Sequence, residues 1–369
     1  MHKKILLIIL ILITSSAYAS EVEIFDISNF ADTMKSFNNE LIDEDYEELI
    51  NNMKQGNFKF DYKKVIGNIG DFLIKEIKSN IGLAIQIVLI SLIMGLLDNL
   101  KSSFSSDGVS QIAFYVCYIL LITLLVSSFT NIYTISKEFL AEITTFMNVL
   151  TPIIIGLIAS TGGITVSSMI YPAIAFFSQF VTLFINNFLL PVSMICFALN
   201  VVTNVSNKIS VSRVAKFLRS SSMWILGIIL TLFVGIVSLE GTVASSVDSV
   251  TVKTAKFLFS GSIPVVGKLL GDSVDTILGS TLIIKDAIGF VGIAVLFGLA
   301  LVPIIKVLVV ISIYSVTGAI IQPFADERIC KCISGTAEAG GVILSMLITV
   351  CVMFMIGTVM LLKFSRFTG

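Results

Sequence analysis

Residues 146–185 read FMNVLTPIIIGLIASTGGITVSSMIYPAIAFFSQFVTLFI, two apolar segments joined by Thr161-Gly162-Gly163. Backbone N–H and C=O groups in lipid must find partners within the segment, so both segments are predicted to be helices. Glycine permits a tight turn between them because it has no Cβ. Pro152 lies inside the first segment, which is short and irregular. The stretch therefore predicts a helical hairpin within a membrane.

The whole chain has the same character. Of its 369 residues, 56% are hydrophobic and 13% are charged, and the mean hydropathy is +0.98. Globular proteins are about 45–50% apolar and about 25% charged, so the composition indicates a membrane protein. Lys and Arg number 24 against 25 Asp and Glu, which leaves no excess of cations for nucleic acid. The single histidine, His2, argues against His-dependent catalysis and His-ligated metals.

Residues 1–19 have the pattern of a signal peptide. Lys3 and Lys4 precede a short apolar run, and the segment ends in Ala17-Tyr18-Ala19, an A-x-A cleavage site. Cleavage is expected after Ala19. The alternative is an uncleaved anchor helix, but the apolar run is well short of the roughly 20 residues that span a bilayer. The mature chain is therefore expected to begin outside the cytoplasmic membrane.

Residues 20–80 form a predicted external acidic helical segment. From Ser20 to Ser79 there are 13 acidic residues and 7 lysines, a net charge of 7 − 13 = −6. Its second half places apolar residues such as Val65, Ile69 and Leu73 at helical spacing, with charges on the other face. This helix either lies in the headgroup layer or belongs to a small helical pair that covers its own apolar face.

Residues 81–369 are predicted to be a multi-pass membrane domain, so the fold class is an all-α polytopic helical membrane protein with about eight or nine membrane segments. The stretch from 290 to 324 is too long for one ordinary span, which leaves the number open. The apolar segments are 81–97, 109–130, 146–160, 164–185, 188–203, 222–239, 290–324 and 340–362.

The cations of the connecting segments predict the orientation. Residues 208–219 carry four cations and no acid, which indicates a cytoplasmic basic loop under the positive-inside rule. This fits an external N-terminus followed by five crossings. The C-terminal Lys363 and Arg366 should also be cytoplasmic, which requires nine crossings.

Residues 251–289 are predicted to be an external pair of amphipathic helices hinged near Gly271 to Asp275. They are interfacial, re-entrant, or lining a polar space, and Lys268, Asp272 and Asp275 are candidate path-lining residues. An offset of 112 residues relates Pro152 to Pro264 and Pro191 to Pro303, as expected of a duplication. Pro152, Pro264, Gly162 and Gly163 are accordingly candidate structural or path-lining residues.

Lys306 is the most conspicuous ionisable residue, because it interrupts an apolar run. A charge at the centre of a bilayer costs about 2.5–3.5 kcal/mol on insertion scales. Either Lys306 lines a path or pairs with another group, or it marks a cytoplasmic turn between two half-spans and reaches the headgroups. The count of nine crossings favours the turn.

The sequence contains no motif of an enzyme. Cys330-Lys331-Cys332 is a C-x-C pair, which without histidines or a second pair is weak evidence for a metal site. The other three cysteines lie in apolar spans and are expected to pack as small hydrophobic residues. Phosphate-binding loops, dinucleotide fingerprints and paired catalytic carboxylates are absent from the sequence. No catalytic residue, metal or cofactor is predicted.

Four stretches resemble a known family. They are NVLTPIIIGLIASTGG (148–163), KISVSRVAKFLRS (208–220), TVKTAKFLFSGSIPVVGKLLGDSVDTILGSTLIIKDAIG (251–289), and ALVPIIKVL leading to GAIIQPF (300–324). The chain resembles the stage III sporulation protein AE family of endospore-forming bacteria, in order over nearly all of its mature length. The pair Cys330 and Cys332 is not part of this resemblance.

The resemblance implies a role in sporulation. Members of the family sit in the mother-cell membrane around the forespore, in a channel or feeding-tube apparatus. Their expected partners are other stage III sporulation proteins, including a cytoplasmic ATPase and ring-forming components, and stage II sporulation protein Q across the intermembrane space. No catalytic residues are carried over.

Two other functions remain open on the residues alone. Proline-interrupted helices and the candidate repeat are also typical of secondary transporters. A cleavable signal peptide and the lack of clustered coupling carboxylates argue against that class. The third possibility is a structural membrane scaffold for the other subunits.

Overall fold

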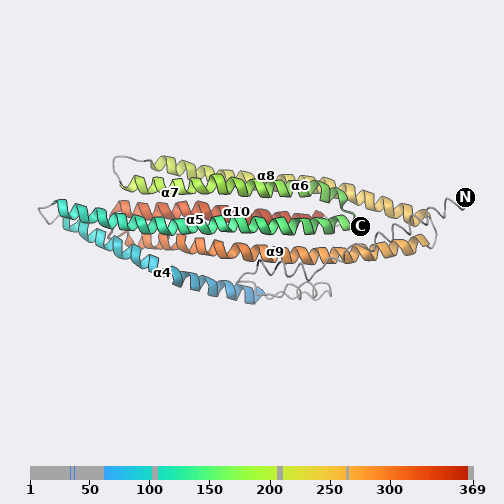
Figure 1. Ribbon diagram of the computed structural model, residues 1–369, viewed down its shortest axis with the longest axis horizontal. Coiled ribbons are helices and arrows are strands. Elements are labelled where there is room, and N and C mark those ends of the chain that lie inside the picture. Colours follow the sequence, from blue (N-terminus) through green and yellow to red (C-terminus); the bar gives the residue numbers. More distant parts are fainter. Residues whose placement is uncertain are drawn as a thin grey trace.

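The computed structural model describes residues 34, 37, 62–101, 107–205, 211–262 and 266–364. The signal peptide with Ala19, and Pro264, lie outside these residues. The described elements are long helices that run side by side (Figure 1). In chain order they are α4 (Tyr62–Lys101), α5 (Asp107–Ser160), α6 (Ile164–Phe184), the π-helical segment η2 (Ile185–Leu189), α7 (Leu190–Val205), α8 (Ser212–Ser262), α9 (Val266–Ile321) and α10 (Glu327–Phe364).

The prediction of an all-α helical membrane protein is confirmed, but that of eight or nine separate segments is wrong for the described ranges. Six continuous helical stretches there are long and apolar enough to cross a membrane. Segments 109–130 and 146–160 are both part of α5, and α6, η2 and α7 unite 164–185 with 188–203. Residues 290–321 belong to the single helix α9.

Packing explains why α5 is continuous. Lys137, Glu138 and Glu142 give residues 131–145 the hydropathy of a loop. The opposite face nevertheless buries Ile132, Phe139 and other apolar residues at helical spacing. This buried stripe holds the polar segment in the helix.

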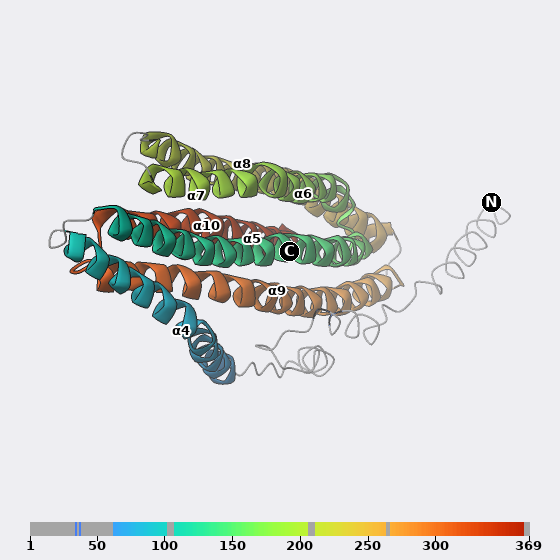
Figure 2. The same ribbon diagram turned by 60° about the vertical axis from the view of Figure 1, so that its left-hand side comes forward.

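The helices form three layers (Figure 1). One outer layer contains α6, α7 and α8, the middle layer α5 and α10, and the other outer layer α9 and α4. Helix α10 contacts α5, α6, α7, α8 and α9, so it is the centre of the bundle. Helix α4 packs on α5 and α9 and leans away from the bundle toward its own N-terminus (Figure 2).

The bundle has two distinct ends. At one end lie the turn between α9 and α10 and the connection between α7 and α8, close to Arg213, Lys216 and Arg219. We call this the basic end. At the other lie the Thr161–Gly163 turn between α5 and α6 and the connection between α8 and α9. We call this the glycine end.

The even number of helices corrects the orientation. Both the first residue of α4 and the last residue of α10 point toward the glycine end, opposite the basic loop. The prediction that the basic loop and Lys363 both face the cytoplasm does not fit this arrangement, because the two lie at opposite ends of the bundle. The external start of the mature chain remains compatible with a cytoplasmic basic loop.

Prolines are accommodated without breaking the bundle. Pro152, Pro172 and Pro303 lie inside α5, α6 and α9. Proline removes one backbone hydrogen bond and crowds the preceding turn. The π-helical segment η2 comes directly before Pro191, where a wider turn relieves this crowding.

A hairpin made by α8 and α9 extends past the rest of the glycine end (Figure 1). Asp248 of α8 is level with the α5–α6 turn, and α8 continues to Ser262, about 20 Å farther at 1.5 Å per residue. The hinge expected at Gly271–Asp275 is wrong, because α9 is continuous from Val266. That residues 251–289 are external stays a prediction.

Candidate functional site

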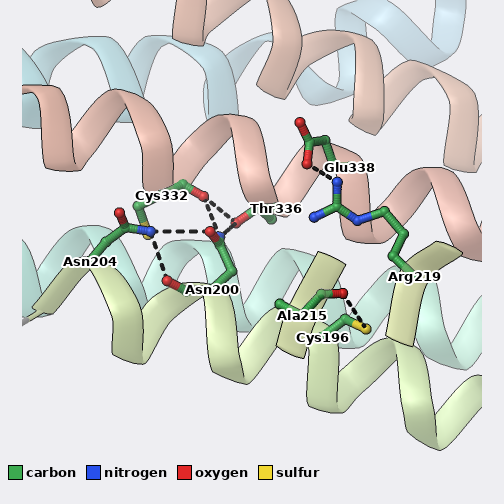
Figure 3. A network of polar contacts seen from close by, with 8 residues as sticks. All are labelled: Cys196, Asn200, Asn204, Ala215, Arg219, Cys332, Thr336 and Glu338. Carbon is green, nitrogen blue, oxygen red and sulfur yellow. Dashed lines mark hydrogen bonds and ion pairs between the residues drawn. The ribbon is translucent and has the colours of Figure 1, made fainter. Parts of the chain in front are cut away.

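A polar network joins α7 to α10 near the basic end (Figure 3). The Asn200 side-chain amide donates to the backbone carbonyl of Cys332 at 2.7 Å and lies 3.5 Å from Thr336 Oγ1. Thr336 Oγ1 donates to the same carbonyl at 2.8 Å. Asn204 Nδ2 donates to the Asn200 carbonyl at 2.7 Å and lies 3.1 Å from Asn200 Oδ1. Asn200 thereby fastens α7 to one turn of α10, and Asn204 supports Asn200 from the next turn of α7.

Gly335 makes room for this network. A Cβ at Gly335 would lie 2.0 Å from Asn200 Oδ1, well inside van der Waals contact. Only glycine lets α10 approach the asparagine this closely. Gly335 and Asn200 therefore act as a pair, one supplying the space and the other the hydrogen bonds.

Replacing Asn200 with alanine should destabilise the bundle by about 1–2 kcal/mol, because a contact between two helices is lost. The measurement is the midpoint of unfolding in detergent titrated with SDS. Thr203→Ala is the matched control on the same helix, since Thr203 Oγ1 donates only to Leu199 of its own helix. Equal effects of the two variants would contradict a role of Asn200 in joining the helices.

An ion pair between Arg219 of α8 and Glu338 of α10 continues the polar region (Figure 3). The Arg219 side chain is 21% exposed and that of Glu338 is 56% exposed. Beside them, the Cys196 thiol lies 3.8 Å from the Ala215 carbonyl of α8. Helix α8 is thus connected to both α7 and α10 within two turns.

The Arg219–Glu338 pair should have a modest coupling energy, because one partner is largely exposed. A double-mutant cycle with Arg219→Gln and Glu338→Gln is expected to give about 0.5–1 kcal/mol. The exposed pair Glu327–Lys331, at 2.7 Å along one turn of α10, is the control and should give less. A coupling near zero would show that the pair does not hold α8 to α10.

Asp248 of α8 caps the start of α6 at the glycine end. Its carboxylate accepts hydrogen bonds from the backbone N–H groups of Thr165 at 2.9 Å and Val166 at 2.8 Å. These are among the first N–H groups of α6, which have no partner within the helix. The side chain of Asp248 is buried, at 2% exposure, so it is the specific acceptor for both groups.

The α5–α6 turn beside Asp248 is built by glycines. Gly163 N–H donates to the Ile158 carbonyl at 3.0 Å and Gly162 N–H to the Ala159 carbonyl at 3.1 Å. This is a Schellman motif, which requires a residue with positive φ after the helix. Gly162 has φ 87°, a conformation that other residues rarely adopt. The tight turn expected at Gly162 and Gly163 is therefore present.

Lys285 of α9 lies at the C-terminal end of α10 and is fully buried. Its Nζ lies 3.3 Å from the Leu362 carbonyl, in the last turn of α10, and 3.4 Å from Asp286 Oδ1. A cation at a helix C-terminus compensates the negative end of the helix dipole and the unpaired carbonyls. Lys285 therefore fastens α10 to α9 where the two helices part.

These polar sites hold helices together. Within the described ranges no three His, Cys, Asp or Glu side chains come together as a metal site. Cys332 is buried and Cys330 is half-buried, and both are free thiols. The C-x-C pair contributes the Cys332 carbonyl to the polar network.

Lys306 does not mark a turn. It is half-buried within α9, fifteen positions before Ile321, and the helix is continuous on both sides. The interpretation as a turn between half-spans, and the ninth crossing that depended on it, are wrong. Lys306 thus lies inside a continuous helix, and a path-lining role stays a prediction.

The other sequence candidates are not brought together. Pro152 is exposed in α5, eight positions before the end of that helix. Lys268, Asp272 and Asp275 lie on the helical backbone of α9 near its start, and their side chains lie outside the described part. They are far along α9 from Lys306.

Local sequence patterns do not indicate these partners. Asn200 and Asp248 each bond to residues more than 80 positions away, and a single polar residue gives no local pattern. Lys285 counted only as one charge of an amphipathic face. The local sequence also does not mark Gly335 as a position where two helices approach closely.

Comparison with known proteins identifies the family. The model of stage III sporulation protein AE matches residues 44–365, which include all described helices from α4 onward. The chain belongs to the stage III sporulation protein AE family. It is 28% identical over 313 residues to stage III sporulation protein AE of Bacillus subtilis (strain 168), covering 85% of this chain and 78% of that protein. No solved structure matches it.

Membership confirms the family resemblance seen in the sequence. The family match and the six apolar helices together make the chain a multi-pass membrane protein of sporulation. The polar network, the Asp248 cap and the Lys285 contact all lie within the matched residues. They are features of the membrane bundle rather than of an added domain.

Proposed function

We propose that the chain is an integral membrane subunit of the channel, or feeding-tube, apparatus that connects mother cell and forespore during endospore development. The observation that carries the proposal is the family match over residues 44–365. The bundle fits the role of a subunit, because its polar groups fix helices to one another and none forms a catalytic constellation among the described residues.

The orientation follows from the charges. The basic end, with Arg213, Lys216 and Arg219, is in the cytoplasm of the mother cell under the positive-inside rule. The glycine end then faces the intermembrane space, which agrees with export of the N-terminal segment by a signal peptide cleaved after Ala19. The α8–α9 hairpin extends into the same space.

The proposed partners follow this orientation. At the basic end the subunit is within reach of the cytoplasmic ATPase and the other stage III sporulation membrane proteins. At the glycine end it faces the ring-forming components and stage II sporulation protein Q. Cross-linking from a cysteine placed near each end, followed by identification of the captured subunit, tests this assignment.

Complementation tests the function. An endospore-forming host that lacks this gene should show reduced late forespore gene expression and few spores, and the intact chain should restore both. Undiminished sporulation of the deletion strain would contradict the proposal. Purified protein in liposomes provides the second measurement: saturable, ion-coupled uptake by the chain alone would indicate a secondary transporter instead.

A further inference from the structure

Three helices share a layer without charged residues. It comprises residues 220–239 of α8, 287–305 of α9 and 339–362 of α10, which are between about 28 and 36 Å long at 1.5 Å per residue. We call it the charge-free layer. Contacts hold the three stretches level: Arg219 pairs with Glu338 at one margin, and Lys285 reaches Leu362 at the other. The layer has the thickness of a bilayer core.

The outer surface of α8 in this layer suits lipid. Most of its exposed side chains are large and apolar, with Ser220 and Thr231 as the exposed polar ones, and Trp224 is 72% exposed. The other large apolar ones are Met223, Ile228, Leu232 and Leu239. This face of the bundle is therefore in contact with acyl chains.

Helix α5 presents a different surface at the same level. A Cβ at Gly292, within the charge-free layer of α9, would lie 2.7 Å from the side chain of Leu150, so the residues around Leu150 are level with the layer. The exposed positions of α5 there include Glu142, Thr145 and Asn148. From Ser127 to Ser160, all described, α5 exposes no large apolar side chain.

The exposed apolar surface of α5 lies nearer the basic end. It spans Ile112 to Val126, whereas on the neighbouring α4 the exposed apolar side chains run from Ile66 to Leu96. Residue 119, the middle of the α5 surface, is about 45 Å along the helix from Leu150. The exposed apolar surface of α5 therefore lies nearer the basic end than the exposed apolar surface of α8 in the charge-free layer. A flat bilayer meets both surfaces when the bundle is tilted, a usual response to such mismatch.

A second observation concerns what lies beside α5. Met34 is buried against the bundle, and the ring of Phe37 packs on Phe146 with centroids 5.2 Å apart. Both residues belong to the acidic segment from Ser20 to Ser79, with its net charge of 7 − 13 = −6. Residues 20–61, ahead of α4, hold 11 acidic residues and 3 lysines, and a stretch of this charge is costly to place in hydrocarbon. Phe37 of this stretch nevertheless packs on Phe146, next to Thr145.

We propose that the bundle sits obliquely in the membrane and that the polar face of α5 around Glu142, Thr145 and Asn148 is the wall of a water-filled recess. The recess opens at the glycine end and extends along α5 to the level of the charge-free layer. At that level α8, on the opposite side of the bundle, contacts lipid. The occupants of the recess are water and small hydrated solutes. This inference rests on the proposed function. The recess is the place where a hydrated solute would enter the membrane.

Thiol labelling tests the recess in the full-length chain in vesicles. Single cysteines replace Thr145 and Asn148 in the recess, Leu232 on the lipid face of α8, and Ile119 on the lipid face of α5. A membrane-impermeant reagent reacts with thiolates in water. Thr145→Cys and Asn148→Cys should react at least tenfold faster than Leu232→Cys and Ile119→Cys. The five native cysteines are buried or half-buried, and labelling of the parent chain is subtracted.

Each other pattern overturns the inference. Slow reaction at Thr145 and Asn148 would place α5 in lipid or in a dry interface. Fast reaction at Leu232 would place α8 outside the bilayer. Fast reaction at Ile119 would place the N-terminal part of α5 in the cytoplasm. Either result would contradict the oblique position. Only variants with the unfolding midpoint of the parent chain are compared.

A functional measurement separates the recess from the proposed function. Glu142→Leu with Thr145→Leu makes the wall apolar, whereas Thr123→Leu changes a polar residue on the lipid-level part of α5. The double variant should lower late forespore gene expression at least fivefold, although the amount of the chain in the membrane is normal. The control variant should leave that expression unchanged. Normal expression with the double variant would refute the role of the recess and leave the subunit assignment intact.

Discussion

Gly95→Ala is expected to destabilise the bundle by about 3 kcal/mol, a large effect for one methyl group. A Cβ at Gly95 of α4 would lie 2.0 Å from the backbone carbonyl oxygen of Phe324, in the turn between α9 and α10. A backbone atom in a turn cannot move aside as a flexible side chain does. The methyl group therefore forces α4 away from the turn.

The measurement for Gly95 is the unfolding midpoint in mixed detergent, with Gly82→Ala as the control. Gly82 lies on the same helix and has no atom within 4 Å of its Cβ position. Its replacement should be neutral or stabilise by about 0.5–1 kcal/mol, since alanine favours helix. If Gly95→Ala behaved like Gly82→Ala, the close packing of α4 on the turn would be disproved.

Asp248→Ala is expected to cost about 2–3 kcal/mol and to loosen the start of α6. The substitution leaves the N–H groups of Thr165 and Val166 without their acceptor, and hydrogen bonds to a charged group are among the stronger ones. Asp248→Asn retains one acceptor oxygen and should cost about half as much. Hydrogen exchange at the amides of Thr165 and Val166 reports the loss directly.

The control for Asp248 is Ser246→Ala on the same helix. Ser246 Oγ donates to the Thr242 carbonyl of its own turn and is exposed, so its loss should change stability by less than about 0.5 kcal/mol. Faster exchange confined to the start of α6 in Asp248→Ala is the expected result. Unchanged exchange at Thr165 and Val166 would show that other groups satisfy these amides.

Local pattern was enough for part of the fold. The apolar stretches, the turn at Gly162 and Gly163, and the all-helical class all follow from residues adjacent in sequence. Hydropathy failed for α5, where Lys137 and Glu138 look like a loop although Phe139 and Ile143 are buried. The helical spacing of those buried residues was available in the sequence and would have predicted continuity.

Lys306 and Asn200 show the other limit. The count of nine crossings predicts a turn at Lys306, yet the apolar residues around it keep α9 helical. Asn200 bonds to a carbonyl 132 positions away, and Gly335 admits it. Contacts of this kind depend on how helices are placed against one another, which no single segment of sequence encodes.

The continuous helices of the α8–α9 hairpin have a mechanical consequence. Unbroken helices bend gently instead of folding at a joint. A sideways force on the hairpin tip is therefore transmitted along both rods to Asp248 and Lys285, where they are fastened to α6 and α10. A partner that binds the end of the hairpin is therefore mechanically coupled to α6 and α10.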